Sequence, residues 1–279
     1  GVRLVGSEMC IRDSLYSHHA VMTLSILQWI FLASAAAMAG FIDAIAGGGG
    51  LIQLPALLIG LSSKPIPMIL GTNKVPAIFG TSFSAAAYFR RIKPDLHLTL
   101  SMAIPAFIGS ASGARLAAIF PKTVFRPIIV ILLILVALYT WKRPHLGMEE
   151  NLKFSPRTRK FVVGGFGLLI GFYDGIFGPG TGSFLLFILV GVVGYAFLKA
   201  SATAKLVNIA TNFAAILTFT FTGHIWWRVG LILAVANIAG SVVGAKLALK
   251  GGSPLVRKVF LCMTFLLIAK VGYDWITTK

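Results

Sequence analysis

Residues 40–49 read GFIDAIAGGG, and residues 171–180 read GFYDGIFGPG. The two stretches are offset by 131 positions (171 minus 40), and each places one aspartate among apolar residues just before a glycine run. Glycine and proline are poor residues for the interior of a helix. Each stretch therefore predicts a helix that carries a carboxylate, Asp43 or Asp174, and that breaks shortly after it.

Other parts of the chain match at the same offset. TNK at 72–74 aligns with TAK at 203–205, and GSASGARLA at 109–117 aligns with GSVVGAKLA at 240–248. Separate matches at one constant offset indicate an internal duplication. We expect three parts: a first membrane repeat over 22–142, a charged inter-repeat loop over 143–160, and a second membrane repeat over 161–279.

The composition favours a membrane protein. The chain is 57% hydrophobic and only 12% charged, whereas soluble domains are about 25% charged. Its net charge of +17 comes from cations placed mostly between apolar segments, as in YFRRIKP at 88–94. That placement fits contact with an anionic lipid bilayer, and no nucleic-acid-binding motif accompanies it. The sequence predicts an all-α polytopic membrane protein with no nucleic-acid partner.

The apolar segments predict about eight transmembrane helices in two homologous four-helix halves. Four crossings in each half would give both halves the same orientation, and five would invert one half; we favour four. Two short apolar pieces, at 51–61 and 182–194, either complete a broken first helix or re-enter the membrane. The expected spans lie near 23–46, 70–89, 97–118, 123–141, 161–177, 199–222, 228–249 and 255–275.

Residues 1–21 differ from the rest of the chain. They are polar and aperiodic, and LVGSEMCIRDS at 4–14 resembles the translation of a sequencing adapter. The ordered parts of a targeting peptide are missing from this segment. We expect a non-native leader over 1–21 and a native start at Met22.

Asp43 and Asp174 are the acids that stand in an apolar, helix-like context, at equivalent places in the two repeats. A charge inside hydrocarbon costs several kcal/mol and usually marks function. Each aspartate would pair with a lysine or carry a coupling proton. The plain alternative is that each one caps a broken helix or lies at the water interface.

Lys74 and Lys205 are also repeat equivalents, and each follows a threonine by two residues. A single such lysine would be expected to snorkel to the headgroups, but the repetition favours a role in binding an anion. Lys205 shares one helix face with two asparagines at i+3 and i+7. The expected binding residues around the lysines are Thr72, Asn73, Thr203, Asn208 and Asn212.

The glycine runs at 47–50 and 178–182 predict unwound backbone lining a protected cavity. Free backbone N–H groups suit a small anion, and glycine lets a ligand approach closely. We include Gly48, Gly49, Gly178 and Gly180 in the expected binding site. Neither run has the lysine and hydroxyl residue of a nucleotide loop. The cysteines and histidines lack metal-ligand spacing, so we expect no metal and no cofactor.

The chain resembles the sulfite exporter TauE/SafE family of bacterial permeases. The resemblance is carried, in order, by GFIDAIAGGGGLIQLPALL, LGTNK, GFYDGIFGPGTGSF and ATAKLVNIATN, and it covers residues 22–279. It implies about eight spans from a four-helix duplication, a multi-pass place in the bacterial inner membrane, and transport of sulfite, organosulfonates or related anions. GPGTG in place of a pure glycine run suggests that the two repeats are not equivalent.

These observations favour a secondary transporter that exports a small anion, with proton coupling as one mechanism. A passive, channel-like pore is the alternative, followed by a membrane-embedded enzyme or a non-transporting subunit. No nucleophile–base pair is evident, so we expect no enzymatic activity. The identity of the anion, the direction, the coupling ion, the membrane orientation and a homo-oligomeric state are left open by the sequence.

Overall fold

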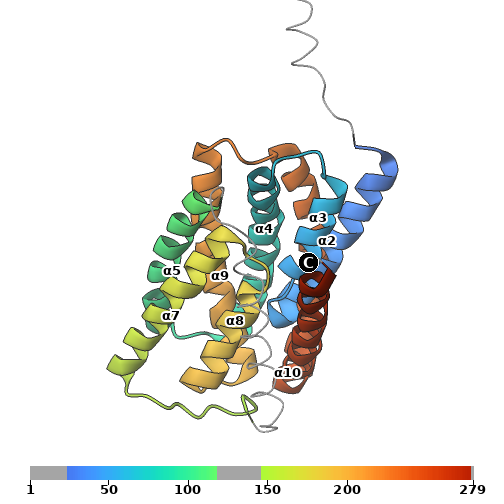
Figure 1. Ribbon diagram of the computed structural model, residues 1–279. Coiled ribbons are helices and arrows are strands. Elements are labelled where there is room, and N and C mark those ends of the chain that lie inside the picture. Colours follow the sequence, from blue (N-terminus) through green and yellow to red (C-terminus); the bar gives the residue numbers. More distant parts are fainter. Residues whose placement is uncertain (1–23, 118–145, 278–279) are drawn as a thin grey trace, which may run out of the picture.

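The computed structural model describes residues 24–117 and 146–277, and all of the regular structure in these ranges is helical (Figure 1). The expected leader at 1–21 and the expected span at 123–141 lie outside the described residues. The helices are α2 (Ile26–Ala46), α3 (Gly50–Gly60), α4 (Ile66–Ile92), α5 (Leu96–Leu116), α7 (Pro156–Ile176), α8 (Thr181–Phe187), the π-helix η1 (Ile188–Val193), α9 (Phe197–Phe221) and α10 (Trp227–Thr277).

The glycine runs break the first helix of each half, as the sequence predicts. Gly47 ends α2 with φ 75° and donates its N–H to the carbonyl of Asp43. After α7, Gly178 and Gly180 have φ values of 90° and 84°. This left-handed conformation is open to glycine and strained for most other residues. The carboxylates of the two stretches therefore lie on the last turns of α2 and α7.

The short helix α3 turns back along α2. Gly49, at the start of α3, packs against Ala39, while Gly60, at its end, packs against Leu32. The Gln28 side chain donates a hydrogen bond of 3.5 Å to the carbonyl of Gly60. This arrangement is the re-entrant alternative for the piece at 51–61, since a helix completing the span would continue in the direction of α2.

Helix α10 holds both of the last two expected spans. It is interrupted at Gly252, which has φ 65° and ψ −165° and precedes Pro254 by two residues. This break lies beside the start of α9, because the Ser253 hydroxyl accepts a hydrogen bond of 3.2 Å from the backbone N–H of Leu198. The chain thus reverses at Gly252, at the end of the bundle where α9 begins.

The two halves are inverted relative to each other. Contacts between α5 and α7 advance together along the sequence, from Met102 with Gly167 to Ser110 with Gly175, so these helices are parallel. Contacts of Gly240 with Ala37 and of Gly244 with Phe41 show that α10 runs parallel to α2.

Helix α4 also runs parallel to α10, as its contacts of Val75 with Gly230 and of Gly80 with Asn237 show. Helix α5 begins at the end of the bundle where α4 finishes and runs back toward the other end, so α2 and α7 point in opposite directions (Figure 1). The common orientation expected from four crossings per half is therefore wrong. The physical reason is the returning helix α3, which adds one reversal to the first half.

The halves are also interlocked. The most extensive helix pairings join α5 to α7 and α2 to α10, and each pairing crosses from one half to the other. A Cβ on Gly109 would overlap the carbonyl of Leu168, and a Cβ on Gly240 would overlap the carbonyl of Ala37. Both partners of the second contact are shifted by 131 residues from those of the first. This correspondence supports the duplication, and it shows the small-residue motifs packing helices closely.

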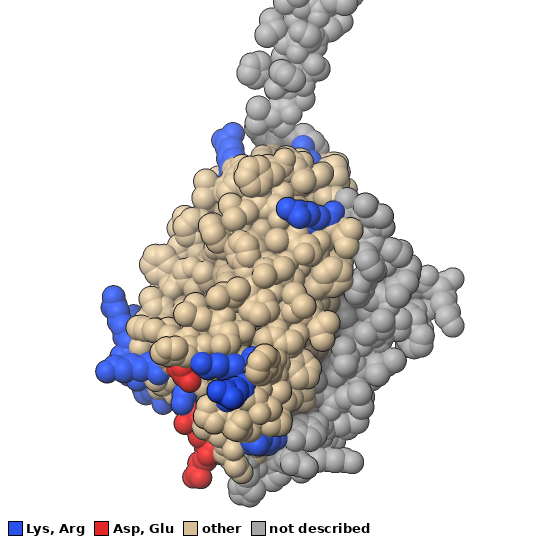
Figure 2. Space-filling view, turned by 90° about the vertical axis from the view of Figure 1, so that its left-hand side faces the viewer, with Lys and Arg blue, Asp and Glu red and all other residues tan. Residues whose placement is uncertain are grey.

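The surface suits a bilayer. Four of the described helical segments are long and apolar enough to cross one, at 26–46, 96–116, 197–221 and 227–266. Large apolar side chains point outward between the ends, including Ile104, Ile108 and Val235. Figure 2 shows that the charged side chains on one face gather at the two ends, with an uncharged belt between them. The chain is an all-α, multi-pass membrane protein.

Candidate functional site

A buried ion pair joins the two halves. The Lys74 ammonium on α4 lies 2.8 Å from Asp174 Oδ1 on α7, and the two side chains are 4% and 2% exposed. The ammonium also donates a hydrogen bond of 2.8 Å to the carbonyl of Asp174. Thr181, at the start of α8, donates its hydroxyl to Asp174 Oδ1 at 2.8 Å. Lysine and aspartate therefore come from opposite repeats, and their pairing holds the break after α7 in place.

Lys205 on α9 occupies the repeat-equivalent position but has different partners. Its ammonium donates to the carbonyl of Asp43 at 3.1 Å and to the Ser201 hydroxyl at 3.1 Å. The Asp43 carboxylate instead accepts hydrogen bonds from the Thr81 hydroxyl at 3.0 Å and from the N–H of Gly49 at 3.3 Å. Within the described residues, no carboxylate oxygen forms an ion pair with Lys205.

The two glycine stretches meet between these lysines. A Cβ on Gly47 would overlap the backbone of Gly182, and a Cβ on Gly182 would overlap the backbone of Gly47. The Ser183 hydroxyl donates to the carbonyl of Ala46 at 3.2 Å. The breaks of the two first helices are thus packed against each other at the centre of the molecule, where glycine is required at both contact points.

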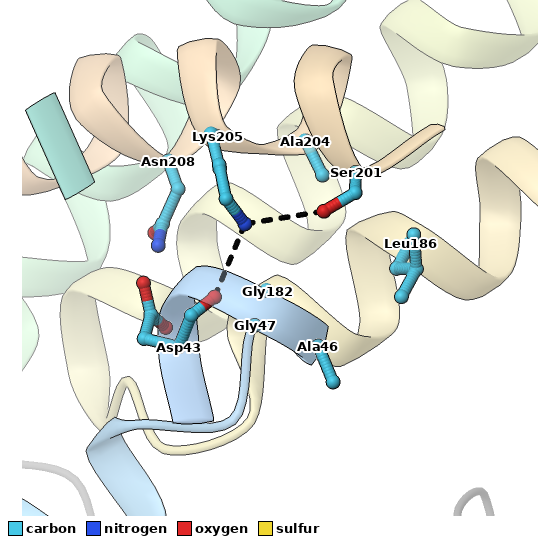
Figure 3. Close-up of a pocket in the computed structure, with 9 residues that line it drawn as sticks. All are labelled: Asp43, Ala46, Gly47, Gly182, Leu186, Ser201, Ala204, Lys205 and Asn208. Atoms are coloured by element: carbon cyan, nitrogen blue, oxygen red, sulfur yellow. Dashed lines mark hydrogen bonds between the residues drawn. The ribbon is translucent and has the colours of Figure 1, made fainter. Parts of the chain in front are cut away.

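A small pocket lies next to this contact, with room for about one water molecule. Figure 3 shows the Lys205 side chain reaching from α9 toward the end of α2, with Ser201 beside it on the same helix. The pocket is lined by Asp43, Ala46, Gly47, Gly182, Leu186, Ser201, Ala204, Lys205 and Asn208. Its walls combine small residues of both glycine stretches, Asp43 and Leu186 with a largely polar face of α9.

Tyr88 on α4 supports the Lys205 side chain. The ammonium lies 4.8 Å from the centre of the Tyr88 ring, within the range of a cation–π interaction. The Tyr88 hydroxyl donates a hydrogen bond of 3.0 Å to the carbonyl of Ala44 on α2. Tyr88 itself is fully buried. The ring therefore packs against the ammonium, which donates its hydrogen bonds to Asp43 and Ser201 in the pocket wall.

The predicted polar residues divide between the pocket and the surrounding packing. Asn208 lines the pocket, and Asn212 donates to the carbonyl of Asn208 at 2.8 Å. Thr72 accepts a hydrogen bond of 2.9 Å from the N–H of Trp226, at the start of α10. Asn73 Oδ1 and Thr203 Oγ1 are buried and have no hydrogen-bond partner among the described residues.

The four glycines that the sequence places in the binding site lie near the Lys205 pocket but do not line it. The N–H of Gly49 is used by Asp43, and Gly178 packs against the ammonium of Lys74. Gly48 and Gly180 belong to the turns, with Gly180 in the left-handed conformation. None of these four lines the Lys205 pocket, which the neighbouring residues Gly47 and Gly182 line instead. A role for the four glycines in binding stays a prediction.

Sequence reasoning missed Ser201, Tyr88 and Thr81. Ser201 could have been found, because it stands four residues before Lys205 and so shares its helix face. Tyr88 and Thr81 carry no local signal, since they reach Lys205 and Asp43 through packing between α4 and the other helices. In the described ranges, no group of three or more His, Cys, Asp or Glu residues is placed to hold a metal ion.

The family model for "Sulfite exporter TauE/SafE" matches residues 32–271, which include both lysines, both aspartates and both glycine stretches. The chain belongs to the sulfite exporter TauE/SafE family. The resemblance seen in the sequence motifs is thereby confirmed.

Named relatives of this TauE/SafE chain match most of its length. A "Probable membrane transporter protein ORF9" of Sinorhizobium sp is 38% identical over 245 residues, covering 88% of this chain and 92% of the relative. A "Probable membrane transporter protein" of Haemophilus influenzae is 39% identical, with coverage of 85% and 91%. "Probable membrane transporter protein YfcA" of Escherichia coli K12 is 38% identical, with coverage of 86% and 87%. No solved structure matches the chain.

Proposed function

We propose that this TauE/SafE protein is a secondary transporter that binds a small anion at Lys205. The proposal rests on one observation: the Lys205 ammonium is buried at 4% exposure, lines a pocket, and has no ion-pair partner in the described part of the chain. The family description supports sulfite or a related sulfur anion as the cargo. The names of the relatives support a membrane transporter and give no cargo.

Electrostatics favours an anion in this pocket. A buried charge is costly unless a counter-charge and hydrogen bonds compensate for it. The carbonyl of Asp43, the hydroxyl of Ser201 and the ring of Tyr88 compensate only in part. An anion beside Lys205 would supply the missing charge, with Ser201 and the Asn208 amide available as hydrogen-bond donors.

The distribution of cations suggests how the protein lies in the membrane. Cytoplasmic loops of membrane proteins carry an excess of Lys and Arg. We therefore propose that the end of the bundle where α9 begins faces the cytoplasm of a bacterial inner membrane. Among the described residues, this end carries Arg90, Arg91, Lys93, Lys153, Arg157, Arg159, Lys160, Lys199, Lys250, Arg257 and Lys258, whereas the other end carries Lys64, Arg115 and Arg228.

The inverted arrangement also explains how two groups of cations that the sequence places on opposite sides of the membrane can share one side. The cations at 250–258 and those at 153–160 would fall on opposite sides of a chain with parallel halves. In the fold they lie at one end, because α10 reaches the end at which α9 begins before it breaks at Gly252. This agreement with the positive-inside rule supports the proposed orientation.

Asp43 is the better placed of the two aspartates to carry a coupling proton. It is partly exposed and lines the pocket, whereas Asp174 is buried in an ion pair. We propose that Asp43 exchanges a proton with the pocket while Lys205 holds the anion. An inward-directed proton gradient would then drive export, and the protein would act as a transporter and not as an enzyme.

Purified protein in proteoliposomes tests this function. Flux of sulfite, thiosulfate and small sulfonates would be measured against chloride, with and without an imposed pH gradient. Saturable flux of a sulfur anion that accumulates against its gradient supports the transporter. Flux that stops at equal concentrations supports the pore instead, and no flux of any anion overturns the proposed function.

A further inference from the structure

The two repeat-equivalent lysines are in different states. Lys74 is neutralised by Asp174 at 2.8 Å, whereas Lys205 has no ion-pair partner within the described ranges and borders a pocket. The equivalent aspartates differ in the same sense, since Asp174 is 2% exposed and Asp43 is partly exposed. The Lys74 half-site is therefore closed by an ion pair, whereas the Lys205 half-site borders a pocket, although the two lysines are equally buried.

The two half-sites also lie toward opposite ends of the molecule. Lys205 is eight residues from the first residue of α9, and Lys74 is eight residues from the first residue of α4. At 1.5 Å per residue, each lysine stands about 12 Å along its helix. Helix α9 begins at the end with most cations. Helix α4 begins at the other end, where Lys64 packs over Trp226.

Side chains at two matched positions are smaller in the half-site that borders the pocket. Ala46 and Ser201 line the Lys205 pocket. Their counterparts in the other repeat are Phe177 and Leu70, which belong to the same apolar cluster around α3 and α4. At these two matched positions the Lys205 half-site has small side chains and the Lys74 half-site has larger apolar ones, although Leu186 also lines the Lys205 pocket.

The closed half-site keeps unused polar atoms. Asp174 Oδ2 and Asn73 Oδ1 are buried without a hydrogen-bond partner among the described residues. Buried polar atoms are normally paired, and each exception calls for an explanation. A cluster that is incompletely satisfied when closed is consistent with a second arrangement in which these atoms have other partners.

We propose that Lys74 is a second anion-binding position, closed in this structure, that exchanges with the Lys205 position during transport. This proposal rests on the proposed function. The anion is held by Lys205 when the site is open to the end with most cations. Opening of the Lys74–Asp174 pair then frees Lys74 to hold the same anion toward the opposite end, while the Lys205 half closes. Such an exchange fits inverted repeats. If the two halves exchange their arrangements, the binding site opens toward the opposite end of the molecule.

Cysteine accessibility tests the exchange without any substrate. Ser201→Cys and Leu70→Cys would be made separately, in a background in which Cys10 and Cys262 are replaced by serine. The rate of reaction with a charged maleimide would be measured on the full chain in detergent. Ser201 and Leu70 are both buried, but of the two only Ser201 lines the pocket, so in the otherwise unaltered protein the cysteine at 201 is expected to react faster than the cysteine at 70.

Asp174→Asn removes the closing ion pair and should shift the protein toward the other arrangement. We expect the cysteine at 70 to react about fivefold faster or more, and the cysteine at 201 to react correspondingly more slowly. Glu150→Gln is the matched control, because it removes the exposed Lys199–Glu150 pair. It should leave both rates unchanged. If Asp174→Asn does not fold, Lys74→Gln combined with Asp174→Asn removes the pair without leaving one charge behind.

Reciprocal changes support the exchange. Unchanged rates at both positions overturn it, and so does a faster rate at 70 with no loss at 201, which would show local loosening. The outcome is separable from the proposed function, because labelling requires no transported anion. If the labelling rates change reciprocally but the protein transports no anion, the conformational exchange is supported and the proposed anion transport is refuted.

Discussion

Gly47 and Gly182 pack backbone against backbone, and neither position has room for a Cβ atom. Gly47 follows α2 in the first half, and Gly182 lies in α8 in the second. Their contact is where the two broken helices meet, and it forms part of the wall beside Lys205. The position of the pocket therefore depends on the absence of two side chains.

Gly182→Ala should destabilise the protein by about 1–3 kcal/mol, as overpacking of a tight interior does. The measurement is the thermal unfolding midpoint in detergent, which should fall by several degrees. Gly165→Ala on the exposed face of α7 is the control, because a Cβ there meets no atom within 4 Å. Equal midpoints for the two variants would contradict the close contact.

The Lys74–Asp174 pair predicts a non-additive mutation series. Removing one partner leaves a buried charge uncompensated, so Lys74→Met or Asp174→Leu alone should cost about 3–5 kcal/mol. The double variant should recover most of this loss, because replacing both charges with apolar groups is often neutral. Unfolding midpoints of all four proteins form the cycle. A double variant that is as unstable as the sum of the two single variants would argue against a direct pair.

The sequence predicts most of the fold, because its signals are local or repeated. Apolar segments place the helices, and glycines after Asp43 and Asp174 place the breaks. The relative orientation of the halves was not predictable in the same way. It depends on whether the short piece at 51–61 continues α2 or turns back along it, and that is decided by the packing of Gly60 against Leu32.

The sequence predicts which residues form the site, but not which lysine pairs with which aspartate. The repeat identifies Lys74, Lys205, Asp43 and Asp174 from sequence alone. Which lysine meets which aspartate depends on helices from opposite halves, so the cross-pairing of Lys74 with Asp174 is visible only in the fold. The difference between the equivalent lysines likewise arises from long-range packing, which no local motif records.

Membrane orientation can be tested at two exposed positions. Asn151 lies at the end with most cations, and Ser62 lies in the turn before α4 at the other end. In a background without Cys10 and Cys262, a membrane-impermeant maleimide should label Ser62→Cys in intact spheroplasts. It should label Asn151→Cys after permeabilisation, because cation-rich ends face the cytoplasm. The reverse pattern would invert the orientation that we propose.

Asp43→Asn tests whether Asp43 carries a coupling proton or has only a structural, charge-pairing role. If Asp43 carries the coupling proton, the variant should still exchange labelled sulfite between the two sides of a proteoliposome. It should lose accumulation driven by an imposed pH gradient, since an amide does not release a proton in this range. Accumulation equal to that of the unaltered protein would remove Asp43 from the coupling mechanism.

The central claim is that the ammonium of Lys205 binds the transported anion. The most direct measurement is sulfite flux in proteoliposomes for Lys205→Ala and for Lys199→Ala, two lysines of the same helix. Lys199 is partly exposed and paired with Glu150, so it serves as the matched control. Loss of a charge-assisted hydrogen bond predicts a fall of about tenfold or more for Lys205→Ala, with near-normal flux for Lys199→Ala. Unaltered sulfite flux in a correctly inserted Lys205→Ala protein would contradict the claim.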